Sequence, residues 1–397
     1  MNGPKPLTIR LHDTDNVVVA RTEIPAGTEI VEEKITCIDP VSFGHKVAAA
    51  TIKAGDGIHK YGQIIGFASR DIQVGAHVHS HNVEMKAFER DYAIGSDAAS
   101  QFEYESEPAT FEGIVRADGR VATRNYIGIV STVNCSASVS RFIADAFKRN
   151  ALAEFPNIDG IVPICHGTGC ACSGSEEGFE LLLNTIAGYV RHPNFAGVLI
   201  IGLGCEVLQI ETLLKNRHLT ESSNLQTMTI QETGGTPKTI NEGIRRIQTM
   251  LPQANKVERR TVPASHLILG LQCGGSDGYS GITANPALGA AVDLLVRHGG
   301  TAVLGETPEI YGAEHLLTRR AASREVGEKL IERIRWWENY TTSHKAEMDN
   351  NPSPGNKAGG LTTILEKSLG AAAKGGTTNL VEVYRFAQPV TAKGLVF

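Results

Sequence analysis

The spacing of hydrophobic and polar residues changes about a quarter of the way along the chain. From residue 7 to about 92, short β-branched runs such as LTIRL, NVVVA and QIIGFA are separated by turn signals, among them Pro25–Gly27 and Ala54–Gly57. The phrases IPAGTEI and IQVGAHV are similar, which favours a meander of related hairpins. Residues 93–112 are polar and acidic without periodicity. The pattern predicts a small all-β domain followed by a linker.

Beyond the linker, apolar strands alternate with helical patterns. YIGIVSTV precedes SASVSRFIADAFKRN, DGIVPI precedes EEGFELLLNTIAGYVRH, and GVLIIGL precedes EVLQIETLLKNR. This alternation predicts βαβ units and mainly parallel sheets. It begins again near residue 260 with SHLILGLQ. We therefore expect a multidomain protein with four segments, 1–92 (all-β), 93–112 (linker), 113–258 (α/β) and 259–397 (second α/β lobe). The last run, KGLVF, predicts an unprotected strand and hence a lobe truncated at its C-terminus.

Charge and hydropathy exclude several classes of protein. The 397 residues include 38 basic and 43 acidic side chains, so a net charge of −5 gives no electrostatic footprint for nucleic acid. No apolar run approaches the ~18 residues of a membrane span, and the N-terminus lacks the apolar core of a signal peptide. These features predict a cytoplasmic protein, in which the seven cysteines are thiols or metal ligands rather than disulfides.

Four of these cysteines directly follow predicted strands. They are Cys135, Cys170, Cys205 and Cys273. Because ligands bind at the carboxyl ends of parallel strands, we expect the four thiols to converge on one sheet edge, where they suit a soft metal or an iron–sulfur cluster. The alternative is that cysteine, a small hydrophobe, simply favours such loops. His166, four residues before Cys170, is a candidate metal ligand, general base or turn residue.

A row of histidines closes the β domain. His77, His79 and His81 alternate in the segment GAHVHSHN, so on a strand all three side chains would share one face. Imidazoles so placed suit a transition metal or proton transfer, although a solvent-facing row is the plain alternative. His45 is a further acid/base candidate. Lys46 is a cationic candidate for a substrate carboxylate, as is Lys60, against the default of an exposed lysine.

Three glycine-rich or constrained turns carry hydrogen-bond donors suited to a polyhydroxylated anion. They supply the candidate substrate-binding residues Arg124, Asn125, Ser276, Asp277, Asn356 and Lys357. Turn chemistry alone would explain most of the glycines. No Walker A loop or complete GxGxxG is present, so an ATP or nicotinamide site has little support.

Long strings of the sequence resemble the altronate/galactarate dehydratase family. They are DGRVATRNYIGIVSTVNCSA, HGTGCACSGSEEGFE, HPNFAGVLIIGLGCEVLQI, LQCGGSDGYSGITANPALG and NPSPGNKAGGL, and LHDTDNVVVA, KYGQIIG and GAHVHSHN resemble its N-terminal SAF-type (β-clip) domain. The resemblance implies dehydration of a sugar acid to a 2-keto-3-deoxy acid with a divalent metal, Fe²⁺ first and Mn²⁺ second, an iron–sulfur cluster being the alternative. The family continues beyond KGLVF.

The resemblance also implies a substrate and roles. His79, His81 and Asn82 fit the altronate-type branch, which favours D-altronate. A galactarate dehydratase, a sulfolactate sulfo-lyase and a non-catalytic sugar-acid or metal-binding protein are the alternatives. The fused β domain favours the sugar-acid enzyme, because the sulfo-lyase relatives carry their two parts on separate chains.

The oligomeric state is a separate prediction. Exposed sheet edges favour a homodimer.

Dehydration of a 2,3-dihydroxy acid needs a base for the C2 proton and an acid for the departing C3 hydroxyl. A metal held by the substrate carboxylate and 2-hydroxyl would stabilise the enediolate. His79 and His81 are the first candidates as metal ligands or acid/base groups, with His45 and His166 behind them. The sequence leaves open whether the metal lies on the histidines or on the cysteines.

Overall fold

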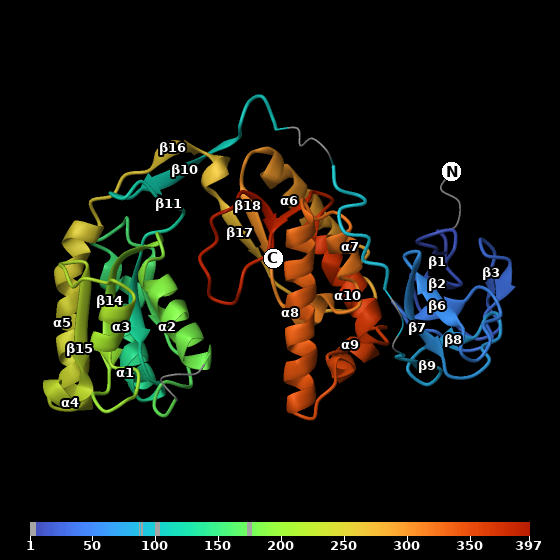
Figure 1. The fold of residues 1–397 in the computed structure, drawn as a ribbon, viewed down its shortest axis with the longest axis horizontal. Coiled ribbons are helices and arrows are strands. Elements are labelled where there is room, and N and C mark those ends of the chain that lie inside the picture. The colour runs from blue at the N-terminus through green and yellow to red at the C-terminus, as the bar shows by residue number, and fades with distance from the viewer. Residues whose placement is uncertain (1–4, 87, 89, 100–103, 173–176) are drawn as a thin grey trace. The chain divides into compact units, whose positions relative to one another are not determined.

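The computed structural model describes every residue except 1–4, 87, 89, 100–103 and 173–176. It forms two compact units. Unit 1 contains residues 1–108, 267–383 and 391–397, and unit 2 contains residues 109–266 and 384–390 (Figure 1). Because one compact unit can contain more than one domain, the division into four segments stays a prediction.

The N-terminal part of unit 1 consists of short strands and turns, with no helix in its described residues from 5 to 86. The strands are β1 (Thr8–Ile9), β2 (Val17–Ala20), β3 (Glu29–Ile30), β4 (Ile35–Thr36), β5 (Lys46–Ala48), β6 (Gly57–Lys60), β7 (Gln63–Ala68), β8 (His77–Val78) and β9 (Val83–Glu84). Antiparallel sheets form in the orders β1-β2-β5-β8 and β6-β7-β9. β-branched residues such as Val17, Ile58 and Ile65 fill the core, as the pattern predicts.

The C-terminal part of unit 1 is an α/β lobe. Its elements are β17 (Ile268–Leu271), α6 (Ala284–Arg297), β18 (Thr301–Leu304), η3 (Thr307–Ile310), α7 (His315–Thr318), α8 (Arg324–Ser343), η4 (Met348–Asn350), α9 (Pro354–Ala358), α10 (Ile364–Ala372), η5 (Ala373–Gly375), β19 (Leu380–Glu382) and β20 (Gly394–Val396). The sheet is parallel, in the order β17-β18-β20-β19. The expectation that KGLVF leaves an unprotected strand is wrong, because β20 lies between β18 and β19 and pairs with both.

Unit 2 is a doubly wound α/β fold. Its elements are β10 (Thr110–Val115), β11 (Val121–Ala122), β12 (Tyr126–Ser131), α1 (Asn134–Asp145), η1 (Arg149–Leu152), β13 (Gly160–Ile164), α2 (Glu177–Val190), β14 (Phe195–Gly202), α3 (Ile210–Asn216), β15 (Leu225–Thr229), α4 (Ile230–Thr233), α5 (Thr236–Ala254), β16 (Arg260–Pro263) and η2 (Ala264–His266). The central sheet, β13-β12-β14-β15, is parallel throughout.

Alternate residues of β12 explain why helices cover both faces of this sheet. Ile127 and Ile129 pack with α1 and α5 in one core, whereas Val130 packs with α2 and α3 in another (Figure 1). Successive strand residues point to opposite faces, so a strand buried on both sides is apolar throughout. The βα alternation predicted for this region is therefore confirmed.

Two features of unit 2 differ from the expected pattern. The stretch 93–112 is not a linker to its end, because β10 begins at Thr110. β10 pairs with β11 and, antiparallel, with β16, so residues 260–263 belong to unit 2 rather than to the second lobe. Short local patterns do not reveal a strand partner about 150 residues away.

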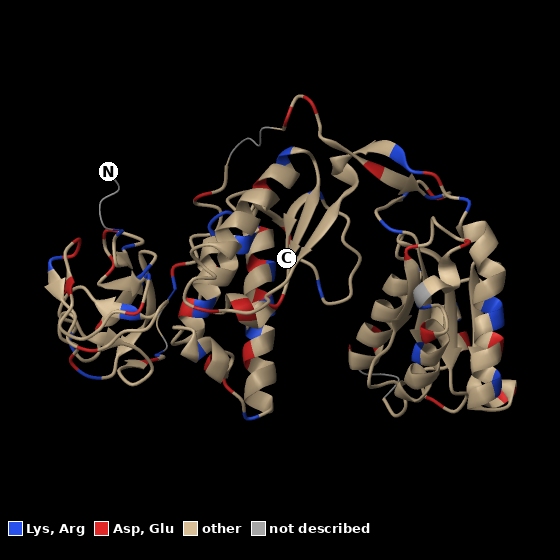
Figure 2. Cartoon of the chain, turned by 180° about the vertical axis from the view of Figure 1, so that it is seen from behind, with Lys and Arg blue, Asp and Glu red and all other residues tan. Residues whose placement is uncertain are grey.

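Charged residues are interspersed through both units (Figure 2). Among the helices that the structure describes, none is long and apolar enough to cross a membrane.

Candidate functional site

Four histidines gather at one end of the N-terminal strands of unit 1. His45 immediately precedes β5, and His77 opens β8, which pairs with β5. The expected strand through His81 is wrong, because β8 ends at Val78 and the chain turns. The Asn82 side chain accepts a hydrogen bond from the His79 backbone N–H at 2.9 Å and closes this turn, a common use of asparagine.

The turn nevertheless brings the rings together. His45 Nδ1 lies 3.0 Å from His77 Nε2. The ring centroids of His45 and His79 are 4.8 Å apart, and those of His77 and His81 are 5.3 Å apart. Asp39 accepts a hydrogen bond from the His77 backbone N–H and holds the start of β8. We call His45, His77, His79 and His81 the histidine cluster.

Residues more than 270 positions later complete the surroundings of the cluster. His79 Nε2 lies 2.8 Å from the carbonyl oxygen of Lys357, and His45 Nε2 lies 3.0 Å from that of Ala358. A carbonyl only accepts, so both Nε2 atoms carry the proton. Asn356 caps α9 together with Ser353 and donates from Nδ2 to the Ser276 carbonyl at 2.9 Å. The predicted loops 274–277 and 351–357 therefore meet beside the cluster.

The environment of His77 and His79 favours their neutral form. Burial, with the neighbouring histidines and Lys46, lowers the pKa of His77 to about 4. Burial also lowers the pKa of His79, although its bond to the Lys357 carbonyl opposes this. A neutral imidazole can accept a proton or bind a cation. His81 is exposed and is the member of the cluster most open to solvent.

The two lysines near the cluster do not face solvent. Lys46 and Lys60 are 0% and 1% exposed, and each places its ammonium 2.9 Å from a different oxygen of Glu366 in α10. Their expected pairing with a substrate carboxylate is therefore wrong, because their charges are already used inside the protein. Glu366 also accepts hydrogen bonds from the backbone and hydroxyl of Thr362. This network fastens the N-terminal strands to the C-terminal lobe.

Close backbone packing holds the loops at the same place. Gly278 and Gly360 both lie against the carbonyl oxygen of Gly44, where an added Cβ would come within 2.1 Å and 2.3 Å of that oxygen. Gly360 also has a φ of +102°, which side chains rarely adopt. Glycine is required at these contacts, and His45 is the next residue after Gly44.

Unit 2 holds three of the four predicted thiols. Cys135 lies in the first turn of α1, Cys170 follows β13, and Cys205 follows β14. Backbone bonds from Asn134 to Thr168 (2.9 Å) and from Val207 to Cys170 (3.2 Å) tie the three loops together. All three thiols are exposed, and slight desolvation and the adjacent Cys170 thiol raise the pKa of Cys135.

The four thiols do not share one sheet edge. Cys273 follows β17, in a different sheet and in unit 1, where its Sγ lies 3.1 Å from the Ser276 hydroxyl. The strand-end pattern correctly indicates the carboxyl edge of a sheet but not which sheet.

The other candidates of unit 2 make structural contacts. His166 Nε2 is 3.0 Å from the Ser131 carbonyl, and burial lowers its pKa. Asn125 is fully buried, where its amide donates to the Asn157 and Ala254 carbonyls and accepts from Arg116. It has no group left for a substrate, so the structure does not support that role. Arg124 is exposed.

Family models match the chain in three consecutive parts. They describe an altronate/galactarate dehydratase SAF domain (residues 6–86), the second domain of D-galactarate dehydratase/altronate hydrolase (113–255) and the C-terminal domain of D-galactarate/altronate dehydratase (264–397). The altronate dehydratase of Bacillus subtilis (strain 168) is 36% identical over 98% of this chain and 77% of its own length. The chain belongs to the altronate/galactarate dehydratase family.

Two relatives from Escherichia coli (strain K12) are equally similar. Its galactarate dehydratase (L-threo-forming) is 37% identical over 99% of this chain, and its altronate dehydratase is 35% identical over 98%, each match covering 77% of the relative. Dehydratases are carbon–oxygen lyases, and the family places this chain in that reaction class. The predicted family and enzyme class are confirmed.

Among the residues that the structure describes, the metal that the family implies has no complete set of ligands. Neutral imidazoles suit a divalent transition metal. However, within the described ranges no group of three or more His, Cys, Asp or Glu side chains is arranged to hold one. The described residues therefore do not fit a metal as they stand, and Fe²⁺, Mn²⁺ and an iron–sulfur cluster stay predictions.

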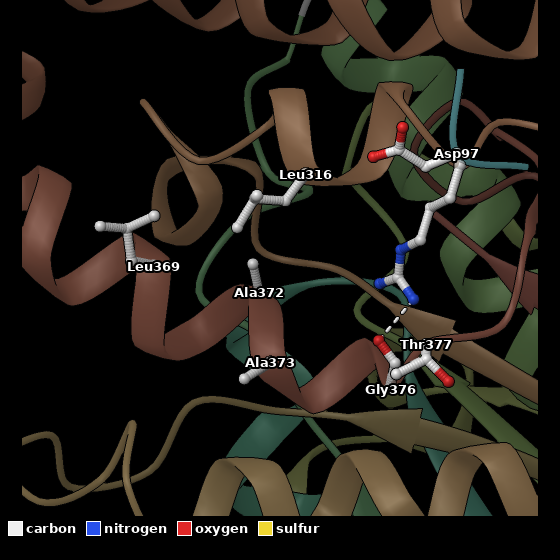
Figure 3. Close-up of a pocket in the computed structure, with 8 residues that line it drawn as sticks. Asp97, Leu316, Leu369, Ala372, Ala373, Gly376 and Thr377 are labelled. Carbon is white, nitrogen blue, oxygen red and sulfur yellow. Dashed lines mark hydrogen bonds between the residues drawn. The ribbon is translucent and has the colours of Figure 1, made fainter. Parts of the chain in front are cut away.

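A cavity of about 310 Å³ in unit 1 does not coincide with the candidate site of this dehydratase-family chain. Aliphatic side chains such as Leu316 and Leu369 line much of it, with Arg320 donating to the Gly376 carbonyl (Figure 3). None of the sequence-predicted site residues lines this cavity. The candidate site of the family member is therefore the histidine cluster with the loops of the C-terminal lobe.

Sequence reasoning missed two contributors to this site. His77 stands in the recognised row but receives no separate role there, although it links His45 to His81. Glu366 lies in an ordinary helical pattern, LTTILEKSLG, and only its partners reveal its importance. Ser80 and Asn82, both turn formers, are the signal that would have ended the strand at Val78.

Proposed function

We propose that the protein is a hydro-lyase that removes water from a sugar acid, D-altronate first, and releases a 2-keto-3-deoxy acid. Family membership supports the reaction class. The observation that carries the proposal is the gathering of imidazoles against the Lys357–Ala358 backbone of the C-terminal lobe. Elimination needs groups that accept and return protons near pH 7, and histidine is suited to this.

In this proposal His81 meets the substrate. It is the exposed member of the cluster, and its ring lies beside that of His77, which in turn contacts His45 at 3.0 Å. The His81 imidazole acts as the base that takes the C2 proton. Departure of the C3 hydroxyl requires a proton, which an imidazolium of the cluster returns.

Lys357 would hold the substrate carboxylate. It stands in α9, only half-buried, and its backbone carbonyl is fixed by His79. In the described part of the chain its ammonium forms no ion pair. Ser276 and Asn356 lie on the loops joined beside it and offer polar groups for sugar hydroxyls.

Galactarate is the second candidate substrate. The relatives that act on altronate and on galactarate are 35–37% identical to the chain, so overall similarity does not separate the two. The sequence HVHSHN favours altronate.

The test is an anaerobic assay of the full chain with Fe²⁺ or Mn²⁺ and either sugar acid, in which 2-keto-3-deoxy acid is measured. We expect product from D-altronate, and about 100-fold or greater loss of kcat in His81→Gln, since general acid–base catalysis contributes roughly 10²–10⁴-fold. His12→Gln, at an exposed histidine of the same domain that contacts Thr14, is the matched control. Product from galactarate alone would change the substrate. Sulfite from sulfolactate, or sugar-acid binding without product, would overturn the dehydratase proposal.

A further inference from the structure

Unit 2 contains a cavity of about 700 Å³ at the amino-terminal edge of its parallel sheet. Its walls come from the β10–β11 turn, the segment between α2 and β14, the α3–β15 loop and the end of α5. β14 and β15 begin here, whereas the exposed thiols follow the carboxyl ends of the strands. A volume of roughly 300–1,000 Å³ is typical of small-molecule pockets.

The cavity has an excess of positive charge. Three arginines, Arg116, Arg120 and Arg191, line it, and Asp118 is the only carboxylate among its described lining residues. Asp118 is fully committed to Arg120, which approaches it at 2.8 Å through Nε and 2.7 Å through Nη2. Arg116 and Arg191 form no ion pair within the described part of the chain. Arg116 and Arg120 both lie in the turn between β10 and β11.

Hydrogen bonds to two neutral groups fix the orientation of the Arg116 side chain. Its Nε donates to the Pro193 carbonyl at 2.7 Å and its Nη2 to Asn125 Oδ1 at 3.0 Å. Neither acceptor neutralises the guanidinium. Burial and Arg120 lower the pKa of Arg116, with Asp118 opposing them, and burial and Arg120 also lower the pKa of His192 in the same wall. A half-buried guanidinium that is fixed in direction, and that forms no ion pair in the described part of the chain, is suited to an oxyanion.

The remaining walls suit an organic body rather than a bare ion. Val190, Phe195 and Leu225 form apolar surface, and Gln253 and Ser222 add neutral polar groups. A ligand that filled the cavity would therefore place its anionic group against the arginines and its uncharged part against this surface.

We propose that unit 2 binds a small organic anion, with a phosphate or carboxylate head, between Arg116 and Arg191. This site lies outside the histidine cluster and goes beyond the dehydration proposed above. Phosphate and carboxylate share the chemistry that a guanidinium recognises, and the experiment separates the two.

Isothermal titration calorimetry of the full chain tests the proposal with three probes, namely inorganic phosphate, adenosine monophosphate and citrate. We expect saturable binding of adenosine monophosphate or citrate, tighter than that of inorganic phosphate because the body adds contacts. Tighter binding of adenosine monophosphate than of citrate would identify a phosphate head. Tighter binding of citrate would identify a carboxylate head. The absence of saturable binding by all three probes would overturn the proposal.

Two variants and a matched control locate the binding. Arg116→Gln and Arg191→Gln should each lower the affinity for the probe at least tenfold. Arg245→Gln removes the same charge from an exposed arginine of α5, outside the cavity, and should change affinity less than twofold. Arg191→Gln keeps the test decisive if Arg116→Gln destabilises unit 2, because the Arg191 side chain donates only to the Arg217 carbonyl in the described structure. Equal affinity in Arg191→Gln and wild type would overturn the proposal, and no turnover measurement enters the result.

Discussion

Replacing Glu366 by glutamine should destabilise unit 1 severely. The carboxylate is 1% exposed and accepts from the ammonium groups of Lys46 and Lys60, each at 2.9 Å. Glutamine preserves the shape of the side chain but removes its charge. Two buried ammonium groups would then share one neutral amide, which cannot compensate their loss of hydration.

Two estimates of the magnitude agree. Removing one partner of a buried ion pair costs about 3–5 kcal/mol. Independently, the two lysines outweigh burial and lower the pKa of Glu366 from 4.5 to about 2, which corresponds to about 3 kcal/mol of stability at neutral pH. A depressed carboxyl pKa contributes stability that is fully present above the unfolded value and is lost as the pH falls through the folded value. Wild type should therefore lose this contribution between pH 4.5 and about pH 2.

Tryptophan fluorescence during urea unfolding measures the change in unit 1 selectively. The chain has two tryptophans, and both lie in α8, which belongs to unit 1. Glu84→Gln is the matched control, since Glu84 pairs with Lys86 at 2.8 Å but is 44% exposed, and exposed pairs contribute about 0–1 kcal/mol. A loss below about 1 kcal/mol in Glu366→Gln, or a loss equal to that of the control, would refute this reasoning.

Three further changes have defined outcomes. Gly278→Ala should cost about 1–3 kcal/mol and weaken turnover, because its Cβ would come within 2.1 Å of the Gly44 carbonyl; urea unfolding and kcat measure this, and wild-type values would contradict it. Asn125→Ala should destabilise unit 2 by about 1–3 kcal/mol through unpaired buried groups while leaving KM unchanged; a raised KM at normal stability would restore its substrate role. Cys135 should react with a thiol reagent in the native protein, whereas Cys37, fully buried with its pKa raised by burial, should react only after unfolding; mass spectrometry of the labelled chain distinguishes the two.

Local patterns predicted the elements that depend on neighbours in sequence. The strands and helices of unit 2 were predictable because Ile127 and Ile129 repeat at the period of a strand, and the helices after them repeat at their own period. The N-terminal strands were predictable because glycine and proline turns separate β-branched runs. The row of histidines was correctly singled out, although through a strand that ends before His79.

What the sequence could not predict depends on distant partners. The sequence predicted Lys46 and Lys60 to be exposed, because no nearby residue in the sequence indicates that Glu366 is their partner. Glu366 lies 306 residues beyond Lys60. The sequence placed Cys273 with the other three thiols, because a position after a strand indicates that a residue lies at the edge of a sheet but does not identify which sheet. The sequence did not predict β16, because this strand forms by pairing with β10, which is distant in the sequence.

The distance between Lys46 and Glu366 has a consequence for biosynthesis. The two residues are 320 positions apart, so a ribosome adding roughly 5–20 residues per second needs roughly 15–60 s between them. During that interval the N-terminal strands must tolerate hydrated lysines on a surface that is dry in the finished protein. The charge of these lysines, which costs energy once they are buried, would then serve the nascent chain by keeping an incomplete surface soluble until α10 emerges.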